Sequence, residues 1–175
     1  MKAGVSLLAA AAASAMLVSP ALASAATASS FGQYSTWSKA QHAAHFTLKH
    51  PSTTFGLKRN GKIIVSQCVI SGKLKDKVVD AQYGSFTKHA VGLEQDNAGV
   101  PCSVAPTSAS LGSYKVEGVT AHLHGFCGSE TPYSCSSTKI ELWLSWKKGG
   151  HYYTASSFNE SRSRLVHFAR TLKKV

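Results

Sequence analysis

Complete catalytic and cofactor motifs are missing from this chain of 175 residues. It has no G-x-S-x-G elbow to expose a nucleophilic serine, no H-E-x-x-H pair to hold a catalytic zinc ion, and no glycine-rich phosphate loop. We therefore expect no cofactor and predict a protein that binds rather than catalyses. A small extracellular hydrolase with a scattered site is the alternative.

Long apolar runs are missing after the first two dozen residues, and none approaches the roughly 20 residues of a membrane helix. Residues 1–23 begin with Lys2, continue as an apolar, alanine-rich run and end in small residues, which is the order of a secretory signal peptide. We expect cleavage after Ala23 or Ala25. No cysteine lies there to carry a lipid anchor, so we expect a secreted, extracellular chain without a transmembrane segment.

Acidic residues are scarce, since 8 Asp and Glu stand against 19 Lys and Arg, and the formal net charge is +11. Loss of Lys2 with the leader would leave +10. This charge favours anionic partners, such as an envelope polymer or an amphiphile. A protein partner is an alternative, and the sequence contains no nucleic-acid-binding motif. We expect a monomer.

All four cysteines, Cys68, Cys102, Cys127 and Cys135, follow the leader, and an even number in an oxidising compartment predicts disulfides. The turn-forming segment GSETPYS favours Cys127 with Cys135, which leaves Cys68 with Cys102, but sequence alone allows three pairings. The spacing lacks the C-x(2–4)-C knuckle of zinc sites, so we expect no metal.

His122 and His124 raise the same question of a metal site, because residues two apart on a strand share a face. Val119, Ala121 and Leu123 alternate with them as the apolar face. The histidines are therefore predicted to point to solvent, and no third ligand accompanies them.

The pattern along the chain predicts a single α+β domain over residues 37–175, after a flexible tail over residues 24–36. A short helix is expected over Trp37–Phe46, capped by Ser35 or Thr36, and an amphipathic helix over residues 160–173, capped by Asn159. The Asn159 sequence also fits a glycosylation acceptor, but the cap explains the residue. Four hairpins are predicted between them: Thr53–Arg59 with Lys62–Ile70, Lys77–Tyr83 with Lys88–Gln95, Ser113–Val116 with Val119–Phe126, and Thr138–Trp146 with His151–Ser157. The expected fold is one curved antiparallel sheet with the two helices packed on it.

The ending W-K-K-G-G-H-Y-Y-T-A-S-S…L-V-H-F-A-R-T-L, preceded by Y-K-V-E-G-V-T-A-H-L, resembles the close of bacterial exported domains of unknown function. These domains look like relatives of lipoprotein-carrier half-barrels, whose curved sheets hold a helix or an apolar ligand. The resemblance covers the last third of the chain and implies a non-enzymatic envelope or secreted domain. It also makes a lipid or lipoprotein carrier an alternative function.

Candidate binding residues lie on the predicted last hairpin. With Gly149-Gly150 as its turn, Trp146 opposes Tyr153 inside and Lys147 opposes Tyr152 outside. Trp143 then shares the polar face with Lys147 and Tyr152, a group suited to sugar stacking, an anionic amphiphile or a protein partner. Glu94 and Asp96 are a weaker candidate for paired-carboxylate chemistry, since they sit beside a predicted solvated turn.

The disulfide framework is directly testable. We expect the native protein purified from the medium to show no thiol that reacts with an alkylating reagent, and four after unfolding and reduction. Mass spectrometry of alkylated native and reduced samples measures this. Four reactive thiols in native material would contradict both the disulfides and the expected compartment.

Overall fold

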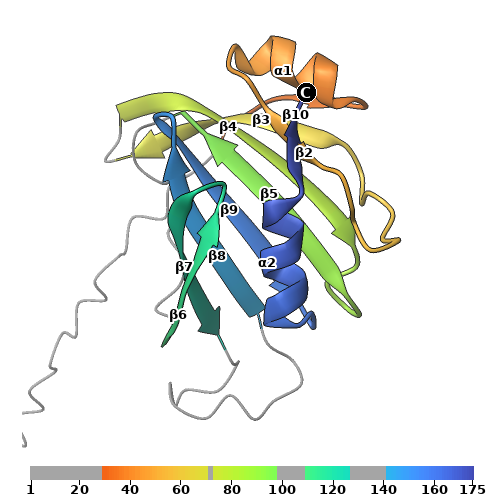
Figure 1. The fold of residues 1–175 in the computed structure, drawn as a ribbon. Helices are drawn as coiled ribbons and strands as arrows, with labels where there is room; N and C mark the ends of the chain where they lie inside the picture. Colours follow the sequence, from red (N-terminus) through yellow and green to blue (C-terminus); the bar gives the residue numbers. More distant parts are fainter. Residues whose placement is uncertain (1–28, 71–72, 98–108, 127–140) are drawn as a thin grey trace, which may run out of the picture.

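The structure is a computed structural model that describes residues 29–70, 73–97, 109–126 and 141–175 (Figure 1). Two helices and ten strands follow one another along the chain: β1 (Ser29–Tyr34), α1 (Trp37–Ala44), β2 (Lys49–Pro51), β3 (Ile63–Ile70), β4 (Lys73–Gly84), β5 (Ala90–Asp96), β6 (Ala109–Val116), β7 (Val119–Phe126), β8 (Glu141–Lys148), β9 (His151–Phe158), α2 (Arg162–Arg170) and β10 (Leu172–Lys174). No helix in these ranges is long and apolar enough to cross a bilayer.

The fold is α+β and mostly antiparallel sheet. Eight strands form one open sheet in the order β1-β3-β4-β5-β9-β8-β7-β6, and β2 with β10 forms a second, two-stranded sheet. Three of the four predicted hairpins are confirmed: β4 with β5, β6 with β7, and β8 with β9. Positive φ angles at Glu117 (51°) and Gly118 (84°), and at Gly149 (61°) and Gly150 (86°), produce the tight turns of the last two.

The predicted hairpin of Thr53–Arg59 with Lys62–Ile70 is wrong in its first half. β3 forms, but the segment before it lies beside the end of β4, where the Asn60 N–H donates to the Gln82 carbonyl (2.7 Å). The Gly84 N–H donates in turn to the Lys58 carbonyl (2.8 Å). Asn60-Gly61 was expected to form the two-residue turn of this hairpin, but only Gly61 takes a positive φ (80°).

Residues 29–34 were predicted within a flexible tail, and they instead form β1 at the edge of the large sheet. β1 pairs antiparallel with β3 from Ser29 opposite Gln67 to Tyr34 opposite Ile63. Backbone hydrogen bonds to an existing strand need no apolar periodicity, so the composition of this segment hides it. Tyr34 packs against the core and helps to hold the strand.

Helix α2 lies across the concave side of the large sheet (Figure 1) and buries Leu165, Val166, Phe168 and Ala169 there. It begins at Arg162 rather than 160, because Ser161 and not Asn159 is the N-cap: the Ser161 hydroxyl accepts from the Arg164 N–H (3.2 Å). The helix ends at Arg170, since the residues after Thr171 continue as β10.

Asn159 has a different task, because it turns the chain from β9 toward α2 with a φ of 54°. Its Nδ2 donates to the Lys88 carbonyl (2.7 Å), and the side chain is half-buried. The amide nitrogen that a glycan would use is therefore engaged in a tertiary hydrogen bond.

Gln95 joins the small sheet to the large one. Its fully buried side chain accepts from the Lys49 N–H through Oε1 (2.7 Å) and donates to the Lys49 carbonyl through Nε2 (2.7 Å). The amide thus replaces the neighbouring strand that β2 lacks on this side. β10 pairs with β2 from Leu172 opposite Pro51, which positions the C-terminal strand as well.

We expect Gln95→Leu to lower the free energy of unfolding by about 2 to 4 kcal/mol, because it keeps the volume but leaves two buried backbone groups of Lys49 unpaired. Urea unfolding measures this. Gln33→Leu, at an exposed position on β1, is the control and should change stability by less than about 0.5 kcal/mol. Equal effects of the two substitutions would show that the Gln95 amide does not hold β2.

Candidate functional site

The predicted binding residues Trp143, Lys147 and Tyr152 all lie on the outer face of the sheet, away from α2. Lys147 pairs with Tyr152 as predicted, and its Nζ lies 4.9 Å from the centroid of the Tyr152 ring. Trp143 pairs with Ser156, so a polar rung, Ser145 opposite Thr154 with hydroxyls 3.2 Å apart, separates it from Tyr152. The three residues therefore share a face without forming one compact cluster.

The register of this hairpin is confirmed on the inner face too. Trp146 lies opposite Tyr153, and their rings stack with centroids 5.4 Å apart and planes 13° from parallel. The Lys49 Nζ sits 4.6 Å above the Tyr153 ring and forms an ion pair with Glu117. Burial, and then Glu117, raises the pKa of Tyr153 to about 12. This end of the core is held by packed rings around a paired lysine.

The histidines of β7 behave as the alternation predicts. Ala121 and Leu123 are fully buried, His122 is exposed and His124 is half-buried, opposite Trp143. In the described ranges, no group of three or more His, Cys, Asp and Glu side chains converges as metal ligands.

A pair of carboxylates faces across β4 and β5 on the same outer face. The sequence drew attention to Glu94 and Asp96, but the residue directly opposite Glu94 is Asp80. Burial, and then the charge of Glu94, raises the pKa of Asp80 to about 6 from 3.8. Asp80 was missed because cross-strand register cannot be read from a single strand.

Asp80→Asn should change how stability depends on pH. Between pH 4 and 6 the folded chain holds a proton that the unfolded chain releases, so the stability contributed by protonated Asp80 is complete below about pH 4 and is lost as pH rises through 6. We expect the variant to exceed the parent by about 2 to 3 kcal/mol at pH 7.5, and to match it near pH 4. Urea unfolding across this range measures it. Glu141→Gln, opposite Phe158 on the same face, is the control. If the stability of Asp80→Asn depended on pH in the same way as that of the parent, the prediction would be contradicted.

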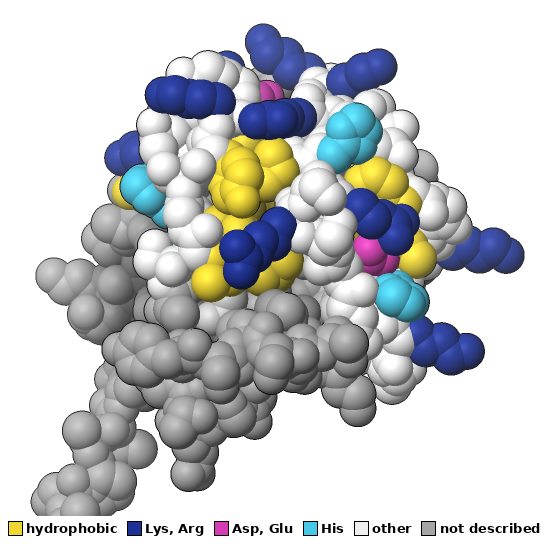
Figure 2. Space-filling view, turned by 60° about the horizontal axis from the view of Figure 1, so that its bottom comes forward, with side chains coloured by type: hydrophobic (Ala, Val, Ile, Leu, Met, Phe, Trp, Pro, Cys, Tyr) yellow, Lys and Arg dark blue, Asp and Glu magenta, His cyan; other side chains and the backbone are white. Residues whose placement is uncertain are grey.

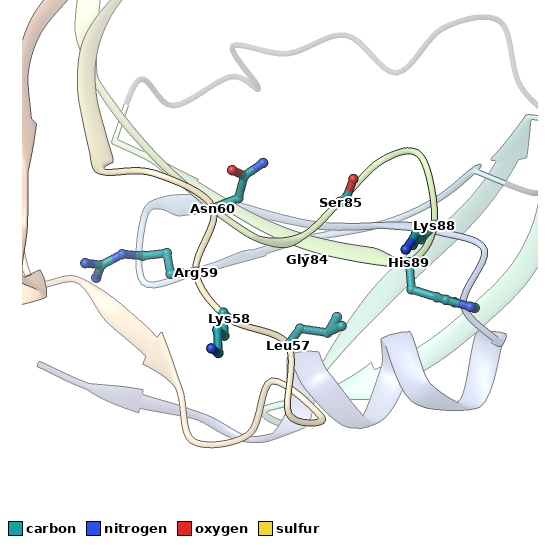
Figure 3. A pocket seen from close by; sticks show the side chains of 8 residues that line it. All are labelled: Leu57, Lys58, Arg59, Asn60, Gly84, Ser85, Lys88 and His89. Atoms are coloured by element: carbon teal, nitrogen blue, oxygen red, sulfur yellow. The ribbon is translucent and has the colours of Figure 1, made fainter.

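A basic groove of about 450 Å³ opens at the end of the sheet where β4 turns into β5 (Figure 3). Two segments form it, one before β3 and one at the turn. Its lining residues are Leu57, Lys58, Arg59, Asn60, Gly84, Ser85, Lys88 and His89, and none of these is acidic. We call these eight residues the basic groove.

Backbone bonds fix the two walls of the basic groove. Residues 58–60 are held along β4 by the two bonds to Gln82 and Gly84 described above, and Arg59 forms a β-bridge with Tyr83. The turn is closed by the Ser85 N–H, which donates to the His89 carbonyl (2.8 Å). Gly84 has a φ of 83°, and an added Cβ would lie 2.2 Å from the same carbonyl. Only glycine fits here, so the shape of this wall depends on Gly84.

The basic side chains of the groove differ in whether other groups of the protein bind them. The Arg59 guanidinium donates to the Ser35 carbonyl (2.6 Å) and the Gly61 carbonyl (3.3 Å), and in Figure 3 it points away from Lys88 and His89. Lys58 and Lys88 are exposed, and no carboxylate of the described residues pairs with either ammonium group. These two lysines are therefore available to an anionic ligand.

One buried acid lies behind the groove. The Glu160 carboxylate contacts the Arg164 guanidinium (2.7 Å) and lies 3.5 Å from the His89 Nδ1, which also bonds the Asn159 carbonyl (2.8 Å). Its side chain is only 2% exposed. The Asn159 carbonyl thus positions His89, while Glu160, paired with Arg164, is closed to solvent.

The basic groove is not among the sites predicted from the sequence. Lys58-Arg59 and Lys88-His89 are 30 positions apart and sit among lysines spread along the whole chain. Gly84 indicates a turn in the sequence, but the residues that this turn brings together depend on the β4–β5 register. Of the predicted disulfide residues, Cys102, Cys127 and Cys135 lie outside the described residues, and of Cys68 only the backbone, in β3, is described.

Comparison of the chain with protein-family models, with curated proteins and with solved structures finds no match. The site must therefore be interpreted from its own geometry.

Proposed function

We propose that this protein is an extracellular, non-catalytic binding protein for an anionic ligand, and that the basic groove is its contact surface. The observation that carries this proposal is the lining itself: four basic side chains, with no acid among the eight residues, around a space of about 450 Å³. Lys58 on one wall and Lys88 on the other are the exposed charges that would contact an anionic ligand.

The charge of the whole chain supports the same partner. The formal net charge, +11 for the full chain and +10 without Lys2, creates a field that attracts polyanions over several ångströms of solvent. On the face shown in Figure 2, Lys and Arg side chains are spread widely and acidic side chains are scarce. The predicted leader and the expected disulfides support an extracellular site of action, where anionic envelope polymers and lipids occur.

Trp143, Lys147 and Tyr152 remain a proposed second contact on the outer face, with the cation–π pair of Lys147 and Tyr152 as its centre. Lipid carriage inside the curved sheet is not part of the proposal, because α2 packs Leu165 and Phe168 onto that face. Hydrolysis is the second candidate function, favoured by Asp80 facing Glu94. Turnover of a glycan or ester by the pure protein that Asp80→Asn abolishes would place it first.

Lys58→Gln with Lys88→Gln should weaken binding to soluble polyphosphate by about 25-fold, since each lysine near an anionic surface contributes on the order of 1 kcal/mol. The slope of log Kd against log salt should fall by about 1 to 2. Calorimetric titration at several salt concentrations measures both quantities.

The matched control is Lys173→Gln with Lys174→Gln, which removes the same charge from exposed positions on β10, away from the basic groove (Figure 1). We expect at most a twofold effect from the control. Equal weakening by both pairs would show that the charge acts diffusely and that the groove is not the site.

A further inference from the structure

We infer that the end of the molecule bearing the basic groove docks on the surface of an anionic lipid bilayer, with Phe86 inserted among the headgroups. This inference rests on the proposed function, because the groove lysines supply the contacts to lipid phosphates. It names lipid, rather than a soluble polymer, as the source of the anionic groups.

Phe86 is the observation that points to a bilayer. It lies at the tip of the β4–β5 turn, between the groove residues Ser85 and Lys88, and its side chain is 42% exposed. Among the described residues only two other large hydrophobic side chains, Ile64 and Val175, are comparably exposed. A soluble polyanion offers an exposed phenyl ring little to contact, whereas the headgroup region of a bilayer accommodates it.

The ring is held outward by the structure around it. Phe158, the last residue of β9, supports it from behind with ring centroids 6.3 Å apart. The turn itself is fixed, since the Lys88 N–H donates to the Ser85 carbonyl (2.9 Å) and the Ser85 and Thr87 hydroxyls lie 2.8 Å apart. Phe86 therefore enters the interface without first being ordered, which lowers the entropic cost of docking.

Lysine and aromatic side chains are arranged here as a membrane surface requires. An apolar ring at the centre gains from burial, while flexible lysines on both sides keep their ammonium groups at the level of the lipid phosphates. Lys88 belongs to the turn itself and the backbone of Lys58 bonds Gly84 at its base, and both lysines are exposed. A single ring and two lysines give reversible rather than permanent attachment.

The test compares vesicles of phosphatidylcholine with vesicles that also contain phosphatidylglycerol, by co-sedimentation. We expect the protein to bind only the anionic vesicles, Phe86→Ala to reduce that binding about five- to tenfold, and Lys58→Gln with Lys88→Gln to abolish it. Phe86→Ala should leave polyphosphate affinity within about twofold. Ile64→Ala, at the exposed hydrophobic residue of β3, is the matched control and should bind vesicles like the parent.

Phe86→Trp adds a direct readout, because its emission should shift to the blue on anionic vesicles and stay unchanged with polyphosphate. Failure of the parent to bind anionic vesicles, or full vesicle binding by Phe86→Ala, would overturn the bilayer inference. Polyphosphate binding that still depends on Lys58 and Lys88 would leave the proposed function standing in that case. If neither vesicle binding nor polyphosphate binding depended on Lys58 and Lys88, both the bilayer inference and the proposed function would be overturned.

Discussion

The packing of α2 into the concave side of the large sheet is the contact on which the rest of the structure depends. Leu165, Phe168 and Ala169 are fully buried there, and Phe168 meets Tyr83 edge-on at a centroid distance of 6.4 Å. A single open sheet exposes two faces to water, and this helix removes the apolar one. Because α2 leads directly into β10, the same packing also positions β10 beside β2, and Gln95 then ties β2 to the sheet.

The outer surface of α2 also contacts the loop that precedes the basic groove. The Arg164 guanidinium lies 4.5 Å from the centroid of the Phe55 ring, and His167 lies 5.8 Å from it on the next turn of the helix. Phe55 has a φ of 55°, a backbone conformation that costs a phenylalanine free energy and persists only when surrounding contacts maintain it. The helix thus anchors the loop that delivers Lys58 to the groove wall.

The parts of this fold that local chemistry determines can be predicted from the sequence. Glu117-Gly118 and Gly149-Gly150 mark two-residue turns, and the alternation around them yields the correct register, down to Trp146 opposite Tyr153. Prediction fails where partners are distant in sequence. Asn60-Gly61 marks a change of direction correctly, but nothing local says that the preceding segment pairs with β4, and Asp80 opposite Glu94 follows from a register between two strands. The groove consists of such non-local pairings, which is why composition indicated a basic protein without locating its site.

Glu160 explains why the groove stays positive although an acid lies beside it. The field of a charge in solution depends on what compensates it nearby, and the Glu160 carboxylate is sealed behind Arg164 and His89. Its charge is paired with Arg164, four residues further on in the first turn of α2. Lys58 and Lys88 are exposed and keep their charges for an external anion. The same acid therefore stabilises the fold without cancelling the surface that we propose to be functional.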